Sequence, residues 1–534
     1  MNIRKLFLLL VVAVCAMSAV GQSSDAVIRD KMTRAVMKVY DDHLAQNPND
    51  YNILFARAHQ NYYNGDYTAA LADVNQALML TPQTDKDLRF DEYILRARIS
   101  DARHDYQSEL TDLMLAHDLR PKSLPCTDLI AKANLKVGNL QAAEKAFKTI
   151  LRAESMNYDA MYGLAQVEQA RGNSKAAIEH VTKAVELFRV EPQVYVNRAD
   201  IYARQGNLDA AVQDLLNGMA VGDGGTAAQA LFDLSDINYD NVMRSLATVA
   251  DKAGENAGVY RYLRANVAMD HTRYGQALKD LNYIRRTHLY NTPMVDYNIA
   301  KCNLELGNYD VAINMVDQAI AADRLNPEFY LVKALAEYYA GDGGNIEPAM
   351  DALKCCALLS PQSVPMLLTK AAIYSRQGDD NTALGYLNAA VAANPNDAEA
   401  LFSRALVLKR LGKDALATRD LNTLMFMSDD VYDLKGFAMS EAGRDDDAYA
   451  WLQRISSTAT AGGENFYYAA ALMALRGDNF RAMDFLQKAI DMGYGSRHRL
   501  VNDVLSPISI QSLRSEQGFD LLVDKAQRNF VEVD

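Results

Sequence analysis

The chain has 534 residues, of which 49% are hydrophobic and 23% charged, and its formal net charge is −13. Nearly half of the residues can enter a core, which excludes a disordered chain. The acidic balance repels phosphate backbones and argues against a nucleic-acid partner. Only 12 prolines and 28 glycines interrupt the sequence, which favours helices joined by short turns.

Residues 1–21 have the features of a signal peptide. Arg4 and Lys5 form a short basic start, an apolar run follows, and Ala19 and Gly21 place small residues where a signal peptidase needs them. We therefore expect an exported protein, periplasmic or secreted, with its mature chain beginning after Gly21.

Neither a lipid anchor nor a membrane span is predicted. Lipid attachment at Cys15 requires a small residue before it, and Val14 stands there instead. No later segment approaches 18 uninterrupted apolar residues, so only association with the envelope is left open. The other cysteines lack CxxC spacing and are interpreted as small buried residues.

Turn glycines recur along the chain at an interval of 34 residues. Gly138, Gly172 and Gly206 follow one another at this spacing. The same interval separates three further pairs: Gly307 and Gly341, Gly378 and Gly412, and Gly443 and Gly477. This period fits a helix–turn–helix unit with short connections.

The unit at 51–84 shows what each repeat requires. Ala58 lies on the inner face of a first helix, Gly65 makes the turn, and Ala70 and Ala77 lie on the inner face of a second helix. Small residues at these places let two helices cross closely. Glycine supplies the backbone conformation that ends the first helix.

This grid of glycines and alanines resembles the tetratricopeptide repeat (TPR) family, over nearly the whole mature chain. The resemblance implies an all-α fold, a right-handed superhelical solenoid of about 12 to 13 helical hairpins. Together with the predicted signal peptide, the resemblance indicates a TPR protein of the secreted or periplasmic bacterial type.

Departures from the grid suggest how the array is divided. Between 222 and 257 the spacing of apolar residues persists, but the turn glycine and the small alanines are lost. We interpret this stretch as a degenerate repeat and joint between an N-terminal array, 22–221, and a C-terminal array, 258–492. The grid stops at 493, and 493–534 is predicted to form capping helices, since a solenoid must cover its ends.

No motif predicts catalysis, a cofactor or a metal site. The eight histidines form no HExxH, and the nearest cluster is His104 with Asp101 and Asp105, which fits an exposed turn. The glycines at 222–225 lack the spacing of a phosphate-binding loop. We therefore expect a protein that is not an enzyme.

In TPR proteins the first helix of each hairpin lines the concave face through positions 2, 5, 9, 12 and 13 of the repeat. Position 5 falls at Phe55, Ile94, Asp128, Tyr162, Val196, Tyr262, Tyr297, Leu331, Leu368, Phe402, Asp433 and Tyr467. Half of these are aromatic, so the resemblance implies partner binding at those six rings. Asn266, at a position 9, joins them, but Tyr262 replaces the lysine that a carboxylate clamp requires at position 5. The alternative is that the rings pack between neighbouring first helices.

The sequence thus predicts a non-catalytic scaffold or adaptor of the bacterial cell envelope. Its protein partner would place a helix or an extended segment in an aromatic-rich concave groove. The alternative is a glycan- or nutrient-binding surface protein built on TPR-like helices. Proteins of that kind usually carry a lipid-anchored cysteine and long inserted loops, so acylation of Cys15 would favour it.

Overall fold

The structure is a computed structural model that describes residues 36–530 apart from 223, 342, 428–431 and 459–461. The predicted signal peptide and Cys15 lie outside the described residues. Within them, every regular element is a helix, and consecutive helices pack against each other as hairpins. None of the described helices combines the length and the apolar composition that crossing a membrane requires.

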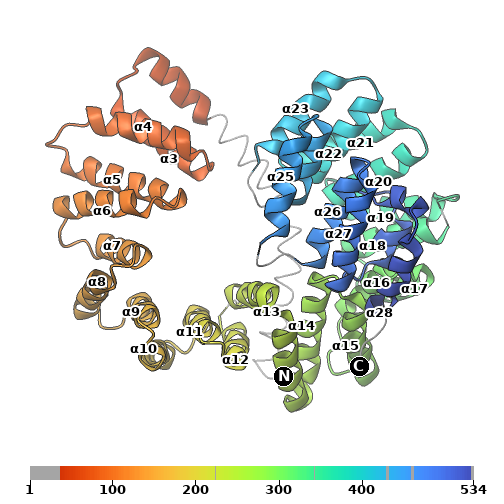
Figure 1. The fold of residues 1–534 in the computed structure, drawn as a ribbon, viewed down its shortest axis with the longest axis horizontal. Helices are drawn as coiled ribbons and strands as arrows, with labels where there is room; N and C mark the ends of the chain where they lie inside the picture. The colour runs from red at the N-terminus through yellow and green to blue at the C-terminus, as the bar shows by residue number, and fades with distance from the viewer. Residues whose placement is uncertain (1–35, 223, 342, 428–431, 459–461, 531–534) are drawn as a thin grey trace. The chain divides into compact units, whose positions relative to one another are not determined.

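The contacts divide the chain into two compact units, one up to Leu231 and one from Phe232 onward. The described part of unit 1 begins with a stretch of helix at 36–46 and continues with five hairpins (Figure 1). Their helices are α3 (Tyr51–Tyr63) and α4 (Tyr67–Leu80), α5 (Lys86–Ala102) and α6 (Tyr106–Leu119), α7 (Leu124–Lys136) and α8 (Leu140–Ala153), α9 (Tyr158–Ala170) and α10 (Ser174–Leu187), and α11 (Pro192–Arg204) and α12 (Leu208–Met219).

Unit 2 contains seven hairpins and a C-terminal segment. The hairpins are α14 (Ala257–Asp270) with α15 (Tyr274–Thr287), α16 (Pro293–Glu305) with α17 (Tyr309–Ala322), α18 (Pro327–Ala340) with α19 (Glu347–Leu359), α20 (Val364–Arg376) with α21 (Asp380–Ala393), α22 (Ala398–Arg410) with α23 (Asp414–Met425), α24 (Tyr432–Glu441) with α25 (Asp445–Ser456), and α26 (Gly463–Leu475) with α27 (Asn479–Asp491). The predicted all-α solenoid of hairpins is confirmed.

The predicted turn is also confirmed in its backbone geometry. Gly206 closes the first helix of its hairpin with φ 75°, and Gly378 does so with φ 84°. This left-handed region is open to glycine at little steric cost. Two hairpins make the same turn without glycine, at His104 (φ 59°) and Thr272 (φ 57°). The hairpin geometry therefore imposes the left-handed turn on whichever residue occupies it.

An arginine–aspartate pair joins the two helices of several hairpins, a feature that the glycine and alanine grid did not reveal. In each pair the guanidinium Nε and Nη2 donate to the two carboxylate oxygens of an aspartate 16 residues later, with nitrogen–oxygen distances of 2.5 to 2.9 Å. The pairs are Arg57–Asp73, Arg96–Asp112, Arg198–Asp214, Arg264–Asp280 and Arg404–Asp420. Every aspartate is buried, so the pair fastens the inside of the hairpin.

The stretch predicted to be a degenerate repeat is occupied by α13 (Gly225–Lys252). Asn238 leaves helical geometry, with φ −137° and ψ 43°, and separates two helical halves without a turn glycine. The boundary between the two compact units falls inside the first half, after Leu231. Whether this stretch acts as a joint stays a prediction.

The C-terminal segment of unit 2 returns to the early repeats of that unit. Only α28 (Phe519–Phe530) is an α-helix in the predicted cap, and short turns of other helix types, His498–Asn502 and Gln511–Ser515, precede it. α28 packs against both α27 and α15 (Figure 1), and Arg273 donates to the Met492 carbonyl at 3.0 Å. The last hairpin of unit 2 is therefore tied to its first.

Candidate partner-binding groove

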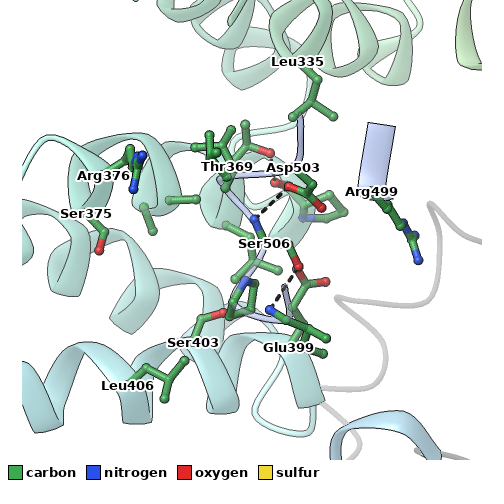
Figure 2. A pocket seen from close by; sticks show the side chains of 18 of the residues that line it. Leu335, Thr369, Ser375, Arg376, Glu399, Ser403, Leu406, Arg499, Asp503 and Ser506 are labelled. Atoms are coloured by element: carbon green, nitrogen blue, oxygen red, sulfur yellow. Dashed lines mark hydrogen bonds between the residues drawn. The ribbon is translucent and has the colours of Figure 1, made fainter. Parts of the chain in front are cut away.

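A cavity of about 820 Å³ opens on the concave side of unit 2 (Figure 2). The first helices of successive hairpins, α16, α18, α20 and α22, form its floor, because these helices pack against one another along the array. Residues of the C-terminal segment between His498 and Ile508 form the opposite wall. The volume is in the range of ordinary ligand-binding clefts.

The floor of the cavity is mainly aliphatic. Leu331 and Leu335 extend from α18, Leu368 from α20 and Leu406 from α22. These leucines occupy positions 5 and 9 of their repeats, so the structure confirms here that those positions face the groove. The repeat geometry thus places a stripe of leucines across three adjacent first helices.

One end of the cavity is polar and positively charged. Arg376 and Arg410 occupy position 13 of α20 and α22, and Figure 2 shows Arg376 beside Ser375 at this end. Arg410 pairs with Asp380 at 2.8 Å and donates to Ser375 Oγ at 2.5 Å. Arg376 is exposed and forms no ion pair within the described part of the chain. It is therefore available to an acidic group of a ligand.

A second cluster of polar groups lies where the C-terminal segment crosses the groove. Tyr339, at position 13 of α18, donates its hydroxyl hydrogen to Asp503 Oδ1 at 3.0 Å and accepts the amide of Leu505 at 3.3 Å. Burial, and next the charge of Asp503, raise the pKa of the Tyr339 hydroxyl well above its usual value, so it remains a donor.

The two predicted site residues of unit 1 are half-buried. Phe55 packs against the core formed by α3, α4 and α5, and its ring meets His59 edge-on at 5.4 Å. Tyr162 packs on α10 and donates its hydroxyl hydrogen to Asp200 at 2.8 Å. Both rings are held by neighbouring helices and keep only part of their surface accessible.

In unit 2 the predicted residues Tyr262 and Asn266 share a hydrogen-bond partner, and Tyr297 packs separately on the next first helix. The amide nitrogen of Asn298 donates to the Tyr262 hydroxyl at 3.1 Å and to the Asn266 side-chain oxygen at 3.0 Å. The Tyr297 ring packs on Phe329 with centroids 5.0 Å apart. Tyr262 and Tyr297 are only 2% and 6% exposed, which favours the packing interpretation over direct contact with a partner.

The last two predicted rings, Phe402 and Tyr467, are also buried. Phe402 meets Phe437 of the next hairpin, with centroids 6.1 Å apart. Tyr467 borders the cavity, yet it stacks on Tyr494 at 4.7 Å and donates to the Arg499 carbonyl at 3.4 Å. In unit 2 the aromatic side chains at position 5 are thus buried against neighbouring residues, whereas the leucines at position 5, Leu331 and Leu368, line the groove. A role of the seven predicted residues in partner binding stays a prediction.

The sequence analysis missed one group of possible ligating residues. Single oxygen or nitrogen atoms of Asp236, Asp270 and His271 lie within 4.8 Å of one another. Burial, and next the charge of Arg273, lower the pKa of His271 to about 4, whereas Asp236 and Asp270 are exposed. Because His271 already contacts Ser235 Oγ at 2.9 Å, we read this group as a polar contact within the fold.

The cysteines behave mainly as small buried residues. Cys126, Cys302 and Cys356 are buried, Cys355 is exposed, and all four are free thiols. Burial raises the pKa of Cys126 and Cys356 to about 11, so they are poor nucleophiles. His104 stands in an exposed turn, as expected, with Nδ1 3.0 Å from the Tyr106 hydroxyl.

The stacked hairpins and the groove between their first helices define a helical repeat protein of the solenoid class. The sequence model of the tetratricopeptide repeat family matches residues 129–192, 165–228, 262–313, 297–344 and 368–422. The chain belongs to the tetratricopeptide repeat proteins.

Two curated relatives match parts of the chain. The tetratricopeptide repeat and J domain-containing co-chaperone DNJ1 of Fusarium oxysporum f. sp. lycopersici is 38% identical over 79 residues, 14% of this chain and 15% of the relative. DnaJ homolog subfamily C member 3 of Gallus gallus is 24% identical over 213 residues, 36% of this chain and 42% of the relative. The chain thus spans less than half the length of either relative.

Among solved structures, yeast Tom70 is similar at 16% identity and a TM-score of 0.34, over 85% of this chain and 98% of that one. Naa15/Naa10 bound to HypK-THB is similar at 16% identity and a TM-score of 0.33, over 95% and 92% of the two chains.

Proposed function

We propose that the chain is a non-catalytic scaffold of the bacterial cell envelope that binds a helix or an extended segment of a protein partner in the groove of unit 2. One observation carries the proposal. The groove combines leucines from successive hairpins with a polar end, and it already accommodates a segment of polypeptide, residues 503–508 of this chain. A surface that packs one peptide segment has the chemistry to pack another.

The proposed groove differs in one respect from the aromatic-rich groove that the sequence predicts. Leu331, Leu368 and Leu406 supply its open apolar surface, whereas the aromatic rings at position 5 lie largely within the fold. Burying such side chains against a partner contributes roughly 25 cal/mol per Å² of apolar surface before the costs of association. The aliphatic stripe is therefore the expected centre of the interface.

The envelope location rests on the sequence of residues 1–21, with its basic start, apolar run and small residues before the expected cleavage. N-terminal sequencing of the protein recovered from envelope fractions tests this part. Cleavage after Gly21 supports export, and a retained N-terminus in the cytoplasmic fraction contradicts it.

Site-specific photo-crosslinking tests the groove. A benzophenone amino acid at Leu368 lies in the cavity, and the same residue at Leu358 lies on the outer helix α19, where the side chain is 84% exposed. We expect a defined protein adduct from position 368 in envelope extracts and none from position 358, with the adduct identified by mass spectrometry.

The result also separates the scaffold from its alternative. Equal adducts at both positions would indicate non-specific adhesion and contradict the proposal. A glycan or small molecule recovered with the protein, and no protein adduct at Leu368, would favour the glycan- or nutrient-binding function.

A further inference from the structure

The segment Asp503–Ile508 crosses the groove of unit 2 in non-helical conformation. It lies far along the chain from the helices that it touches, since Asp503 contacts Tyr339 across 164 residues. Figure 2 shows Asp503 beside Thr369 of α20, and Ser506 on the side of Glu399 and Ser403 of α22. The segment thus occupies the surface that the proposed function assigns to a partner.

The segment is held by side chains rather than by a ladder of backbone hydrogen bonds. Tyr339 binds both the Asp503 carboxylate and the Leu505 amide. Within the segment, the Ser506 amide donates to Asp503 Oδ1 at 3.0 Å and the Ile508 amide to Ser506 Oγ at 3.1 Å. Val504 and Leu505 add apolar contacts from a half-buried position. One tyrosine hydroxyl therefore recognises a carboxylate and the amide two residues after it.

The residues on either side of the segment are fixed much more firmly. Leu500 precedes it and Ile510 and Leu513 follow it, and all three side chains are fully buried. The segment also borders a second cavity, of about 630 Å³, because Val504 lines both cavities and Tyr309 and Val501 line the second. Because the segment is held at both ends and borders two cavities, it can move out of the groove while the buried residues on either side stay in place.

We propose that Asp503–Ile508 is an intramolecular ligand of the groove that a partner displaces, and that the partner segment has the same chemistry. That chemistry is a carboxylate for the Tyr339 hydroxyl, an amide two residues later, and aliphatic side chains for the leucine stripe. The inference rests on the proposed function, because it takes the same groove as the binding surface. It adds that the segment covers part of the groove in the isolated chain and that Tyr339 selects an acidic, aliphatic segment.

A peptide supplied separately tests the proposal. The probe is a fluorescein-labelled synthetic peptide with the sequence of residues 500–511, and its anisotropy is measured with the full chain. The second chain carries Asp503→Ala and Leu505→Ala, which remove the carboxylate and the aliphatic contact of the tethered segment. We expect the peptide to bind this variant at least about tenfold more tightly than the unaltered chain, because its competitor is weakened.

Two controls define the contacts. Adding Tyr339→Phe to the weakened chain keeps the ring but removes the hydroxyl, and we expect it to lower the affinity for the peptide about tenfold. A peptide with asparagine in place of Asp503 should bind more weakly by a similar factor. Equal affinity for the unaltered and weakened chains, or binding to neither, would overturn the proposal.

Hydrogen exchange in the unaltered chain gives a test that needs no variant to fold. The amides of Leu500 and Leu513 are bonded to backbone carbonyls at 3.2 and 2.9 Å, and that of Leu505 to Tyr339. We expect Leu505 to exchange at least about tenfold faster than the two anchors, because the segment opens locally. Exchange of all three at one rate would show that the segment leaves only when unit 2 unfolds, and the proposal would fail.

The outcomes also separate this inference from the proposed function. A partner that crosslinks at Leu368 equally in the unaltered and weakened chains would support the scaffold function, but it would show that the segment does not compete with the partner. Sedimentation experiments cover one further outcome. If the unaltered chain dimerised and the weakened chain stayed monomeric, the segment would bind a second copy of the chain, and this result would also overturn the proposal.

Discussion

At the scale of single residues, the arginine–aspartate pairs are short, two-point electrostatic contacts inside the hairpins. Arg198 lies on α11 and Asp214 on α12, with Nε and Nη2 each 2.6 Å from a carboxylate oxygen. The aspartate is buried, so its charge depends on the guanidinium for compensation. The spacing of 16 residues between the two partners is visible in the sequence, and a search for charge pairs at that interval would have found them.

Removing only the arginine should therefore be costly. We expect Arg198→Met to lower the free energy of unfolding by about 3 to 5 kcal/mol, because Asp214 keeps a buried, unpaired charge. The double variant with Asp214→Leu should recover most of this loss. Urea denaturation measures both, and Lys354→Met, which breaks an exposed pair, is the control with an effect below about 1 kcal/mol. A double variant as unstable as the single one would contradict this account.

His271 should make the stability of unit 2 depend on pH. Its pKa falls from 6.5 to about 4 in the folded chain, chiefly through burial. Between these values the unfolded chain binds a proton that the folded chain does not, so stability decreases as the pH falls through the window. The contribution is complete above pH 6.5 and its slope is at most about 1.4 kcal/mol per pH unit.

Carboxylates of the chain titrate in the same pH range and add their own pH dependence to the stability. Subtracting the unfolding free energy of His271→Gln from that of the unaltered chain removes this contribution, because both chains share it. We expect the difference in unfolding free energy to change between pH 7 and pH 4 and to be constant above pH 7. A flat difference across the whole range would show that His271 titrates normally in the fold.

At the scale of elements, the turn between helices follows directly from the sequence. The interval of 34 residues located the glycines, and their left-handed backbone explains why glycine is chosen. His104 stands at this turn in place of glycine, and the structure shows it in the same left-handed conformation, at φ 59°. Local backbone sterics are encoded within a few residues, which is why this level could be predicted.

Restoring glycine at this turn should stabilise unit 1. We expect His104→Gly to raise the free energy of unfolding by about 1 kcal/mol, because a left-handed conformation costs a non-glycine residue about that much. The loss of the exposed contact with Tyr106 offsets part of the gain. Gly206→Ala, at an equivalent turn, should show the reverse change in thermal denaturation. Destabilisation by His104→Gly would mean that the histidine contact outweighs the backbone strain.

The C-terminal segment shows where prediction from the sequence ends. The loss of the repeat after 493 indicated a cap, but nothing in its local pattern indicates a return to Tyr339 or to α15. Such contacts join residues more than 150 positions apart and occur once, so no period marks them. For the same reason the grid indicated that position 5 faces the groove, yet it could not tell which rings the neighbouring helices would cover.

The helix α28 should contribute strongly to the stability of unit 2. Phe519 is 2% exposed, and the Asn529 side chain donates to the carbonyls of Ile490 and Tyr494 at 2.9 and 3.1 Å. We expect Phe519→Ala to cost about 3 to 5 kcal/mol, as for other buried aromatic residues. Leu521→Ala, on the exposed side of the same helix, should change stability by less than about 0.5 kcal/mol. Similar effects of the two substitutions in urea denaturation would place α28 outside the core.

At the scale of the whole molecule, the division into two compact units predicts two separable unfolding events. Contacts in a solenoid are local, so a lesion weakens its own unit and reaches other repeats only through their neighbours. Arg198 belongs to unit 1 and Phe519 to unit 2. Each unit should therefore lose its protection against hydrogen exchange at its own denaturant concentration.

The two destabilising substitutions provide the test. We expect Arg198→Met to lower the urea concentration at which the amides of α9 to α12 lose protection, and to leave those of α20 to α27 unchanged. Phe519→Ala should have the opposite pattern, since α15 and α27, against which α28 packs, belong to unit 2. Hydrogen exchange followed by mass spectrometry reads both sets of helices in one experiment. If either substitution shifted all the helices together, the chain would unfold as one cooperative body, and stability would be shared across the boundary at Leu231.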